Sequence, residues 1–242
     1  MLSKAKIKFI KSLQIKKYRK QEQSFIVEGA KSVRELLDSD FDVVTLAGTN
    51  GFLSTVRAKN QVEVIEVGEH ELNALGEFQT NDAALAVARM RPNEFLSVKT
   101  DEFALLLDDI RDPGNLGTII RTADWFGVTK IIASTETADF YNPKVISATM
   151  GSFTRIKVFY TELADYLQSG NLPVYGTYLE GANIRKVAFG SGGLILIGNE
   201  SKGIHPELEK FVTQKVTVPK SGRAESLNAG IATGIFLFHA TS

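Results

Sequence analysis

Polar side chains that could bind a ligand occur in three short segments of the chain, each beside a turn. In the segment at residues 198–203, Gly198 and Gly203 let the backbone approach a ligand closely, while Asn199 and Glu200 supply hydrogen-bond acceptors. Taken alone, each segment also has a structural explanation as a helix cap, a glycine turn or a salt bridge. The three segments contribute, in order, Asn115 with Arg121, Asn199 with Glu200, and Ser226 with Asn228.

The C-terminal part of the chain contains the elements that must position these residues. The continuous apolar run 103–107 is typical of a parallel strand covered on both faces. Alternating strands and helices predict a mainly parallel α/β sheet, and ligands bind such sheets beyond the carboxyl ends of the strands, here after Leu107, Ile197 and Val218. The further expected strands are 130–133, 155–159, 174–177, 194–197 and 215–218, with helices at 116–126, 144–150, 162–167 and from about 226.

The closing helix has a distinctive pattern. Its apolar residues recur at helical spacing and predict one face that packs against the core. Gly230 and Gly234 lie beside that face, and because glycine is costly inside a helix, they predict that another backbone passes close. The residues of the predicted core face are Leu227, Ile231, Ile235 and Phe238.

The N-terminal part of the chain has an α/β pattern of its own. We expect a helix over residues 1–20, a buried strand at 25–29 entering a helix at 30–37, and strands at 41–47, 62–67 and 84–89. Proline and polar residues at 91–101 interrupt the pattern and predict a linker. The sequence therefore predicts two domains, residues 1–95 and residues 96–242.

The net charge of zero hides an uneven distribution. Eight of the 28 basic residues lie in residues 1–20, which hold no acid, so the rest of the chain has 20 basic and 28 acidic residues. A basic arm on an acidic body favours contact with a phosphate backbone. The alternative is an amphipathic helix whose lysines merely face water. The candidate nucleic-acid contacts in this arm are Lys11, Lys16, Lys17 and Arg19.

Composition excludes several kinds of chemistry. The absence of cysteine excludes disulfides, thiolate metal sites and cysteine nucleophiles. His70, His205 and His239 lack metal-ligand spacing, so we expect surface or capping roles and no metal. Apolar runs are shorter than the roughly 18 to 20 residues of a membrane span, and the basic N-terminus lacks a secretory apolar segment. We therefore expect no membrane partner and a cytoplasmic location.

The three segments together resemble the signature motifs of the SpoU (TrmH-type) RNA methyltransferases of the SPOUT superfamily. The resemblance covers residues 100–242 and extends more loosely to the substrate-binding domain common in that family, through Lys11 to Leu13, Lys17 to Arg19 and Phe25 to Gly29. The matching segments are residues 112–117 with 121–123, residues 198–200 with Gly203, and residues 218–219 with 226–228.

The resemblance implies a fold and an activity that the periodicity does not predict. The fold would be an α/β trefoil-knot (SPOUT) methyltransferase domain with a smaller N-terminal α/β substrate-binding domain. Its knot would bind S-adenosylmethionine, and a homodimer with its active site near the interface would methylate a ribose 2′-hydroxyl in 23S rRNA or tRNA. The implied cofactor contacts are Thr177, Tyr178, Leu179, Gly198, Asn199, Val218, Pro219, Ser226, Leu227 and Asn228.

The family's catalytic positions match Asn115, Arg121, Glu200, Ser226 and Asn228. Arginine ordinarily stays protonated, so we favour Arg121 as a group that binds phosphate and orients the ribose, with general-base action as the family's usual proposal. Glu200 would then position its neighbours. Lys220 and Glu225 depart from the family pattern without touching the matched residues. The non-enzyme alternative is a catalytically inactive RNA-binding module that retains the fold, and the intact catalytic set argues against it.

Overall fold

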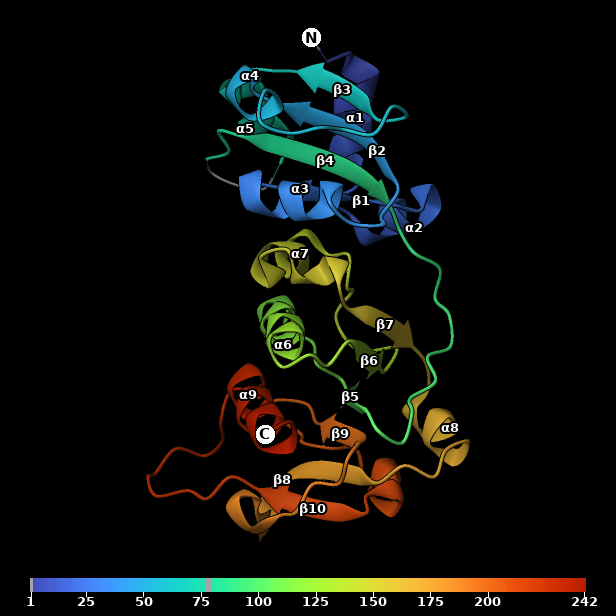
Figure 1. The fold of residues 1–242 in the computed structure, drawn as a ribbon, viewed down its shortest axis with the longest axis vertical. Helices are drawn as coiled ribbons and strands as arrows, with labels where there is room; N and C mark the ends of the chain where they lie inside the picture. Colours follow the sequence, from blue (N-terminus) through green and yellow to red (C-terminus); the bar gives the residue numbers. More distant parts are fainter. Residues whose placement is uncertain (1, 77–79) are drawn as a thin grey trace. The chain divides into compact units, whose positions relative to one another are not determined.

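The computed structural model describes residues 2–76 and 80–242, and the chain separates into two compact units. Unit 1 consists of Met1–Pro92 together with Asp139–Thr154, and unit 2 consists of Asn93–Ala138 together with Arg155–Ser242. Each unit has its own sheet and its own helices (Figure 1).

Unit 1 is built on a four-stranded sheet in the order β1-β4-β2-β3. Strand β4 runs antiparallel to both of its neighbours, whereas β2 and β3 are parallel. The strands are β1 (Ser24–Glu28), β2 (Val43–Gly48), β3 (Glu63–Glu66) and β4 (Ala84–Arg89). The helices are α1 (Lys4–Ser12), α2 (Lys16–Glu22), α3 (Ala30–Leu37), α4 (Asn50–Leu53), α5 (Glu69–Leu75) and α7 (Pro143–Thr149), with the 3-10 turn η1 (Ser152–Thr154).

The prediction of a single helix over residues 1–20 was wrong, because the chain turns between α1 and α2. The carbonyl oxygens of Leu13 and Gln14 at this turn accept hydrogen bonds from Nη1 of Arg19, at 2.9 and 2.8 Å. Leu13 is fully buried, while Ile15 remains exposed. The break is thus stabilised by a buried arginine in the following helix.

Aromatic rings join the two chain segments of unit 1. Phe25 of β1 packs against Tyr141 and Phe153, with ring centroids 4.7 and 6.0 Å apart. Phe41 lies 5.8 Å from Phe153 and also packs against Phe25. Residues 139–154 therefore supply part of the core in which β1 is buried.

Unit 2 contains the predicted parallel sheet. Its six strands are ordered β10-β8-β9-β5-β6-β7, and every neighbouring pair is parallel. The strands are β5 (Phe103–Leu107), β6 (Lys130–Ala133), β7 (Lys157–Tyr160), β8 (Val174–Asn183), β9 (Gly193–Ile197) and β10 (Gln214–Thr217). The helices are α6 (Pro113–Trp125), α8 (Leu163–Gln168) and α9 (Ala229–Ala240), with the 3-10 helices η2 (Ile184–Lys186) and η3 (Pro206–Phe211).

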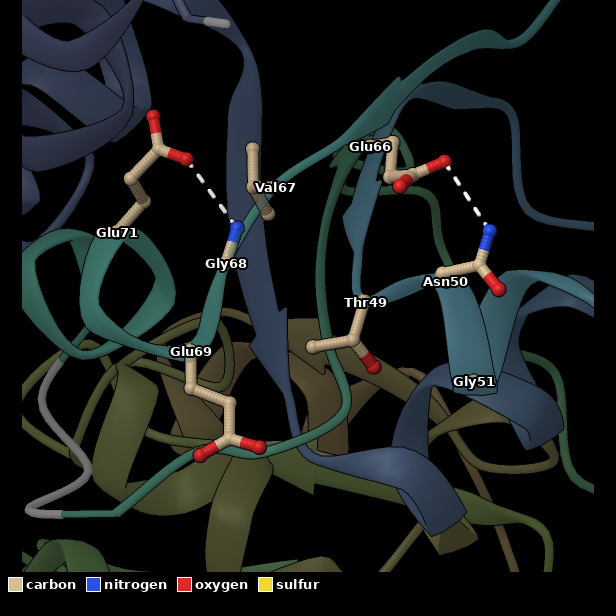
Figure 2. Close-up of a pocket in the computed structure, with 8 residues that line it drawn as sticks. All are labelled: Thr49, Asn50, Gly51, Glu66, Val67, Gly68, Glu69 and Glu71. Carbon is tan, nitrogen blue, oxygen red and sulfur yellow. Dashed lines mark hydrogen bonds between the residues drawn. The ribbon is translucent and has the colours of Figure 1, made fainter.

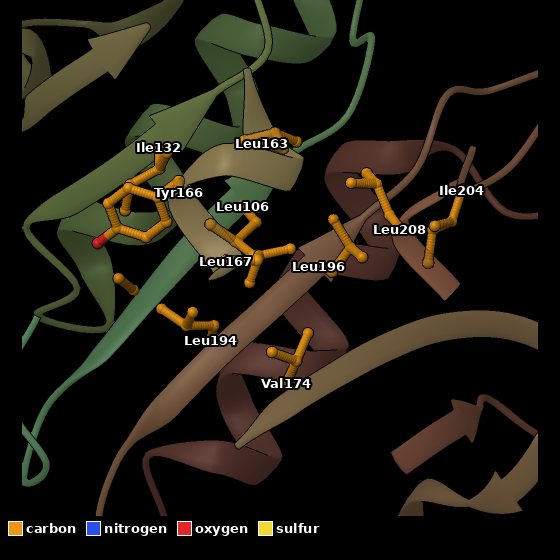
Figure 3. Packing of buried hydrophobic residues seen from close by; sticks show 11 residues of the cluster. Leu106, Ile132, Leu163, Tyr166, Leu167, Val174, Leu194, Leu196, Ile204 and Leu208 are labelled. Atoms are coloured by element: carbon orange, nitrogen blue, oxygen red, sulfur yellow. The ribbon is translucent and has the colours of Figure 1, made fainter. Parts of the chain in front are cut away.

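One face of this sheet is covered by α8 and η3 over an apolar cluster (Figure 3). Leu106 and Leu196 of the central strands are fully buried, and Leu167 and Leu208 pack onto them from the two helical elements. This core explains why the central strands read as continuous apolar runs.

Helices α6 and α9 pack against each other at two glycines. A Cβ atom on Gly230 would lie 2.8 Å from Cγ2 of Thr118, and one on Gly234 would lie 3.6 Å from Cγ2 of Thr122. The predicted close approach is therefore present at Gly230, but the neighbour is a threonine side chain of α6 and not a backbone.

The predicted core face of α9 was wrong. Leu227, Ile231 and Phe238 are 48, 55 and 58% exposed, whereas Phe236 and Leu237 of the opposite side are buried. The helix is apolar all round, so periodicity alone could not select the inner face. An apolar surface is left exposed on α9.

The trefoil knot implied by the resemblance is not tested by strand order and stays a prediction.

No helix within residues 2–76 and 80–242 is both long enough and apolar enough to cross a bilayer.

Candidate functional site

The first two polar segments start from adjacent strands of unit 2. Leu107 of β5 lies opposite Ile197 of β9, and the next residue, Asp108, donates its N–H to the carbonyl oxygen of Ile197 at 2.9 Å. Because the strands are parallel, both segments leave the sheet at the same edge, as predicted.

The first segment forms the start of α6. Asp112 is the N-cap, and its Oδ1 accepts a hydrogen bond from the backbone N–H of Asn115 at 2.8 Å. Pro113 occupies the first helical position, where proline is favoured, so the helix begins before Asn115 and Asn115 is not its cap. The side chain of Asn115 is therefore available for other contacts.

A continuous chain of hydrogen bonds joins the three predicted segments. Nδ2 of Asn115 donates to Oε1 of Glu200 at 2.7 Å, and Nδ2 of Asn228 donates to Oδ1 of Asn115, also at 2.7 Å. Asn228 is at the same time the N-cap of α9, since its Oδ1 accepts from the backbone N–H groups of Gly230 and Ile231. The amide of Asn115 is thus fixed from both sides by residues 85 and 113 positions away.

The second segment is a closed loop after β9. Asn199 and Gly203 exchange two backbone hydrogen bonds of 3.0 and 2.9 Å, and Oδ1 of Asn199 accepts from the N–H groups of Ser201 and Lys202. A Cβ on Gly198 would lie only 2.4 Å from the backbone carbon of Gly203. Gly198 therefore accommodates the loop's own backbone, in place of the predicted approach to a ligand.

Two buried aspartates next to this loop were not assigned a role from the sequence. Nδ2 of Asn199 donates to the carbonyl oxygen of Asp109 at 2.7 Å, and the N–H of His205 donates to Oδ2 of Asp108 at 2.7 Å. The hydrogen bond from its imidazole to Asp108 and the nearby negative charge raise the pKa of His205. A lone histidine without metal-ligand spacing offered no signal for this pair.

Arg121 and Ser226 lie outside the hydrogen-bond chain. Both are exposed, and neither side chain has a hydrogen bond or ion pair to another described residue. Arg121 lies six residues beyond Asn115 on α6, which corresponds to about 9 Å along the helix axis. The structure therefore connects three of the five predicted catalytic residues and leaves an exposed cation on the same helix.

The predicted cofactor segment coincides with an irregularity in the sheet. Lys215 of β10 lies opposite Gly176 of β8, but the next residue, Val216, lies opposite Ala182, so residues 177–181 have no partner in this register. Thr217 Oγ1 donates to the carbonyl oxygen of Leu179 at 2.9 Å. Thr177 is half-buried, while the Leu179 side chain is 75% exposed.

Tyr178 points toward the core of unit 2. Its ring packs on the apolar cluster under η3, and burial raises the pKa of its hydroxyl. Its Oη is buried and has no hydrogen-bond partner among the described residues. Tyr178 can therefore offer its backbone at this edge, while its side chain anchors the segment. Of the other predicted cofactor positions, Val218 is half-buried, and Pro219 and Leu227 are exposed.

The basic N-terminal residues divide into exposed and buried members. Lys11, Lys16 and Lys17 are exposed on α1 and α2. Arg19, in contrast, is 1% exposed, and its Nη2 lies 2.6 Å from Oδ2 of Asp139. The prediction that Arg19 contacts RNA was wrong, because its guanidinium is engaged inside unit 1.

A separate pocket opens in unit 1 where β2 and β3 end (Figure 2). Glu66 accepts a hydrogen bond from Nδ2 of Asn50 at 3.3 Å, and Glu71 accepts one from the N–H of Gly68 at 3.1 Å. With Glu69 also in its lining, the pocket is acidic and does not suit phosphate. None of the predicted site residues lines it.

Comparison with known proteins agrees with the geometry of unit 2. Residues 102–238 match the SpoU rRNA Methylase family, and residues 4–86 match the MRM3-like substrate binding domain. The chain belongs to the SpoU rRNA methylase family. A Bacillus subtilis relative of this SpoU methylase, named 23S rRNA (guanosine(2553)-2′-O)-methyltransferase RlmP, is 32% identical over 238 residues, which are 97% of this chain and 95% of that protein.

Solved structures share the fold of this SpoU methylase over nearly its whole length. A TrmH-family protein from Porphyromonas gingivalis aligns with a TM-score of 0.90 and 36% identity, covering 99% of this chain and 98% of that one. An AdoMet-bound rRNA methyltransferase from Sinorhizobium meliloti also gives a TM-score of 0.90, with 33% identity and 99% and 95% coverage. The family and the α/β fold with a parallel sheet, both predicted from the sequence, are confirmed.

Proposed function

We propose that this SpoU methylase transfers a methyl group from S-adenosylmethionine to a ribose 2′-hydroxyl of 23S rRNA in the cytoplasm. The observation that carries the proposal is the hydrogen-bond chain from Asn228 through Asn115 to Glu200, which joins three distant segments at one sheet edge. The Bacillus subtilis relative, named for methylation of 23S rRNA, supports this substrate class.

The residues at this edge suit the cofactor. Leu179 within β8 and Leu227 on the segment after β10 are exposed apolar side chains that can cover an adenine ring. The hydrogen bond from Thr217, the last residue of β10, to the carbonyl of Leu179 holds this irregular part of β8 against β10. We assign the backbone of residues 177–179, Gly198, Asn199, Val218 and Pro219 to cofactor binding, with S-adenosylmethionine supplying an electrophilic methyl on its sulfonium.

The chain's own residues orient the reacting hydroxyl. A ribose hydroxyl is a weak nucleophile, and it must lose its proton while its oxygen bonds to the methyl carbon. Arg121 binds a phosphate next to the target ribose and stabilises the negative charge that develops, while water takes the proton. Glu200 and Asn228 hold the amide of Asn115 in one orientation, so its second N–H is directed at the bound ligands. Ser226, whose hydroxyl is exposed, is the fifth residue of the proposed catalytic set.

The proposed RNA-binding domain is residues 1–95, with residues 96–242 as the methyltransferase domain. The match of residues 4–86 to a substrate binding domain and the exposed Lys11, Lys16 and Lys17 support this division. In the structure, residues 139–154 pack with the N-terminal domain as part of unit 1.

Methyl transfer to RNA tests the proposal directly. Purified protein is incubated with labelled S-adenosylmethionine and total RNA from a strain that lacks the gene, and the product is mapped by nucleotide mass. We expect one methylated ribose in 23S rRNA, with guanosine 2553 of the Bacillus subtilis relative as the first position to inspect. Cofactor binding without transfer to any RNA class would favour the alternative, a binding module that has lost catalysis.

We also propose that the active form is a homodimer joined through the outer face of α9. Ile231 and Phe238 expose more than half of their surface there, and Phe126 at the end of α6 has its ring 6.4 Å from that of Phe238. Trp125, one turn after Arg121, is 84% exposed. Contiguous exposed apolar side chains of this kind mark interfaces, so a second copy would lie next to Arg121.

The oligomeric state in solution tests the proposed dimer. We expect the wild-type protein to sediment as a dimer and the double variant Ile231→Glu, Phe238→Glu to sediment as a monomer. Val64→Glu, which charges an exposed apolar residue of β3 in unit 1, is the matched control and should remain dimeric. A monomeric wild-type protein with full activity would contradict the dimer.

A further inference from the structure

Two consecutive aspartates at the end of β5 hold both ends of the loop that carries Glu200. At the start of the loop, Nδ2 of Asn199 donates to the carbonyl oxygen and Oδ2 of Asp109, at 2.7 and 3.3 Å. At its end, the N–H of His205 and the imidazole Nδ1 each lie 2.7 Å from an oxygen of Asp108. Glu200 lies between these two attachment points, so β5 determines where the loop stands.

Both carboxylates are buried, which makes their partners important. Asp108 is 3% exposed and Asp109 1% exposed. Asp109 also accepts from Nε of Arg111 at 2.6 Å, whereas every described hydrogen bond to the carboxylate of Asp108 comes from His205. Removing the imidazole would leave a buried carboxylate with only a backbone N–H, and an undersatisfied buried charge strains its surroundings.

Strand β5 also leads into α6, and Asn115 in the first turn of α6 donates a hydrogen bond to Glu200. A loop displaced by even 1 Å would lose the 2.7 Å hydrogen bond between these two side chains. We propose that His205 is a positioning residue for methyl transfer, which through Asp108 holds the loop so that Glu200 orients Asn115. The proposal rests on the proposed function, because it assigns a role within that site.

The electrostatic surroundings of His205 are uniformly acidic. Asp108, Asp109 and Glu207 are the charged groups that act on its imidazole, and each of them raises its pKa. Below this raised pKa the pair with Asp108 is a charge-assisted hydrogen bond, and above it the neutral imidazole is a weaker donor. The loop should therefore be held most firmly below that pKa and less firmly as pH rises through it.

The test compares two substitutions at this position. His205→Asn keeps an N–H donor near the place of Nδ1 but cannot titrate, and His205→Ala removes both properties. His70→Ala, at an exposed histidine of unit 1, is the control. The measurements are kcat and KM from about pH 6 to about pH 9, and amide hydrogen exchange of residues 199–205 in the folded proteins.

We expect His205→Ala to lower kcat about tenfold, with the KM for S-adenosylmethionine changed less than about twofold, and to speed exchange in the loop. His205→Asn should recover most of the lost kcat and should lack the decline in kcat that the wild-type protein shows as pH rises through the pKa of His205. Equal kcat and equal exchange in His205→Ala and His70→Ala would overturn the proposal. If the wild-type protein methylates no RNA, the proposed function fails, and unchanged loop exchange would still reject the role of His205 independently.

Discussion

Two arginines, one in each unit, are held in opposite ways. Arg19 is buried, and its guanidinium donates to two carbonyl oxygens and to the carboxylate of Asp139. Arg121 is exposed on α6, and its guanidinium has no hydrogen bond to any described residue. Arg19 lies in the predicted substrate-binding domain and Arg121 in a predicted catalytic motif, and both were predicted from the sequence to contact RNA. The structure separates them by where their donors are directed.

The contrast shows how an arginine can be read as structural or functional. A guanidinium whose donors are all satisfied internally stabilises the chain and has little left for a ligand. One that stands exposed beside an ordered polar network is placed to bind a phosphate. Substitution of Arg19 should therefore lower the free energy of unfolding, and substitution of Arg121 should lower the rate of methyl transfer.

The largest effect is expected from Arg19→Met. The substitution leaves the half-buried carboxylate of Asp139 and the carbonyls of Leu13 and Gln14 without their donor, so the free energy of unfolding should fall by about 3 to 5 kcal/mol. Urea unfolding measures this. Lys20→Met, at the exposed neighbouring position, should change it by less than about 0.5 kcal/mol. Equal effects of the two substitutions would remove the structural role of Arg19.

Arg121→Ala should lower the rate of methyl transfer by about 100-fold or more, because a charge that stabilises the transition state is lost. The affinity for S-adenosylmethionine, measured by calorimetry, and the unfolding midpoint should hardly change. Arg121→Lys keeps the charge without the planar fork and should be intermediate. Equal losses of cofactor affinity and transfer rate would contradict the assigned role.

Glu200→Gln tests the network beside Arg121 and should have a smaller effect. Glutamine can still accept from Asn115 but without charge, so we expect kcat to fall about tenfold. In a double-mutant cycle, Glu200→Gln and Asn115→Ala should be strongly non-additive, since both act on one hydrogen bond. Additive losses would mean that the two residues act independently.

The smallest effect is expected from the exposed cations of unit 1. Replacing Lys11, Lys16 and Lys17 by glutamine should weaken RNA binding up to about tenfold and reduce the slope of log affinity against log salt by up to about 0.7 to 0.9 per contact. Lys6→Gln is the control, because Nζ of Lys6 is already 2.5 Å from Oε2 of Glu63. An unchanged slope in the triple variant would place the RNA contacts elsewhere.

Most of the catalytic unit could be predicted from the sequence for a simple physical reason. Strands buried on both faces are continuous apolar runs, so the parallel strands around 103–107 were recognisable. Asn115, Glu200 and Asn228 stood in turn-containing segments that follow predicted strands, and the order of the three segments selected the family. Their hydrogen bonds confirm that the three segments meet.

The remaining features depend on contacts that periodicity cannot express. The break after α1 is held by an arginine in the next helix, and α9 packs against the threonines of α6 at its two glycines. The pairing of Asp108 with His205 spans 97 residues, and neither residue carries a local pattern that would reveal it. Burial and long-range hydrogen bonding determined each of these outcomes.

The divided composition of unit 1 has a consequence for the order of folding during synthesis. Phe25 and Phe41 leave the ribosome early, but Tyr141 and Phe153, against which they pack, emerge only after β5, α6 and β6 have been made. Domains usually fold from the N-terminus as they are completed. Here the first unit must keep part of its aromatic core uncovered until residue 154 has emerged, so the nascent chain is most vulnerable to aggregation and proteolysis in that interval.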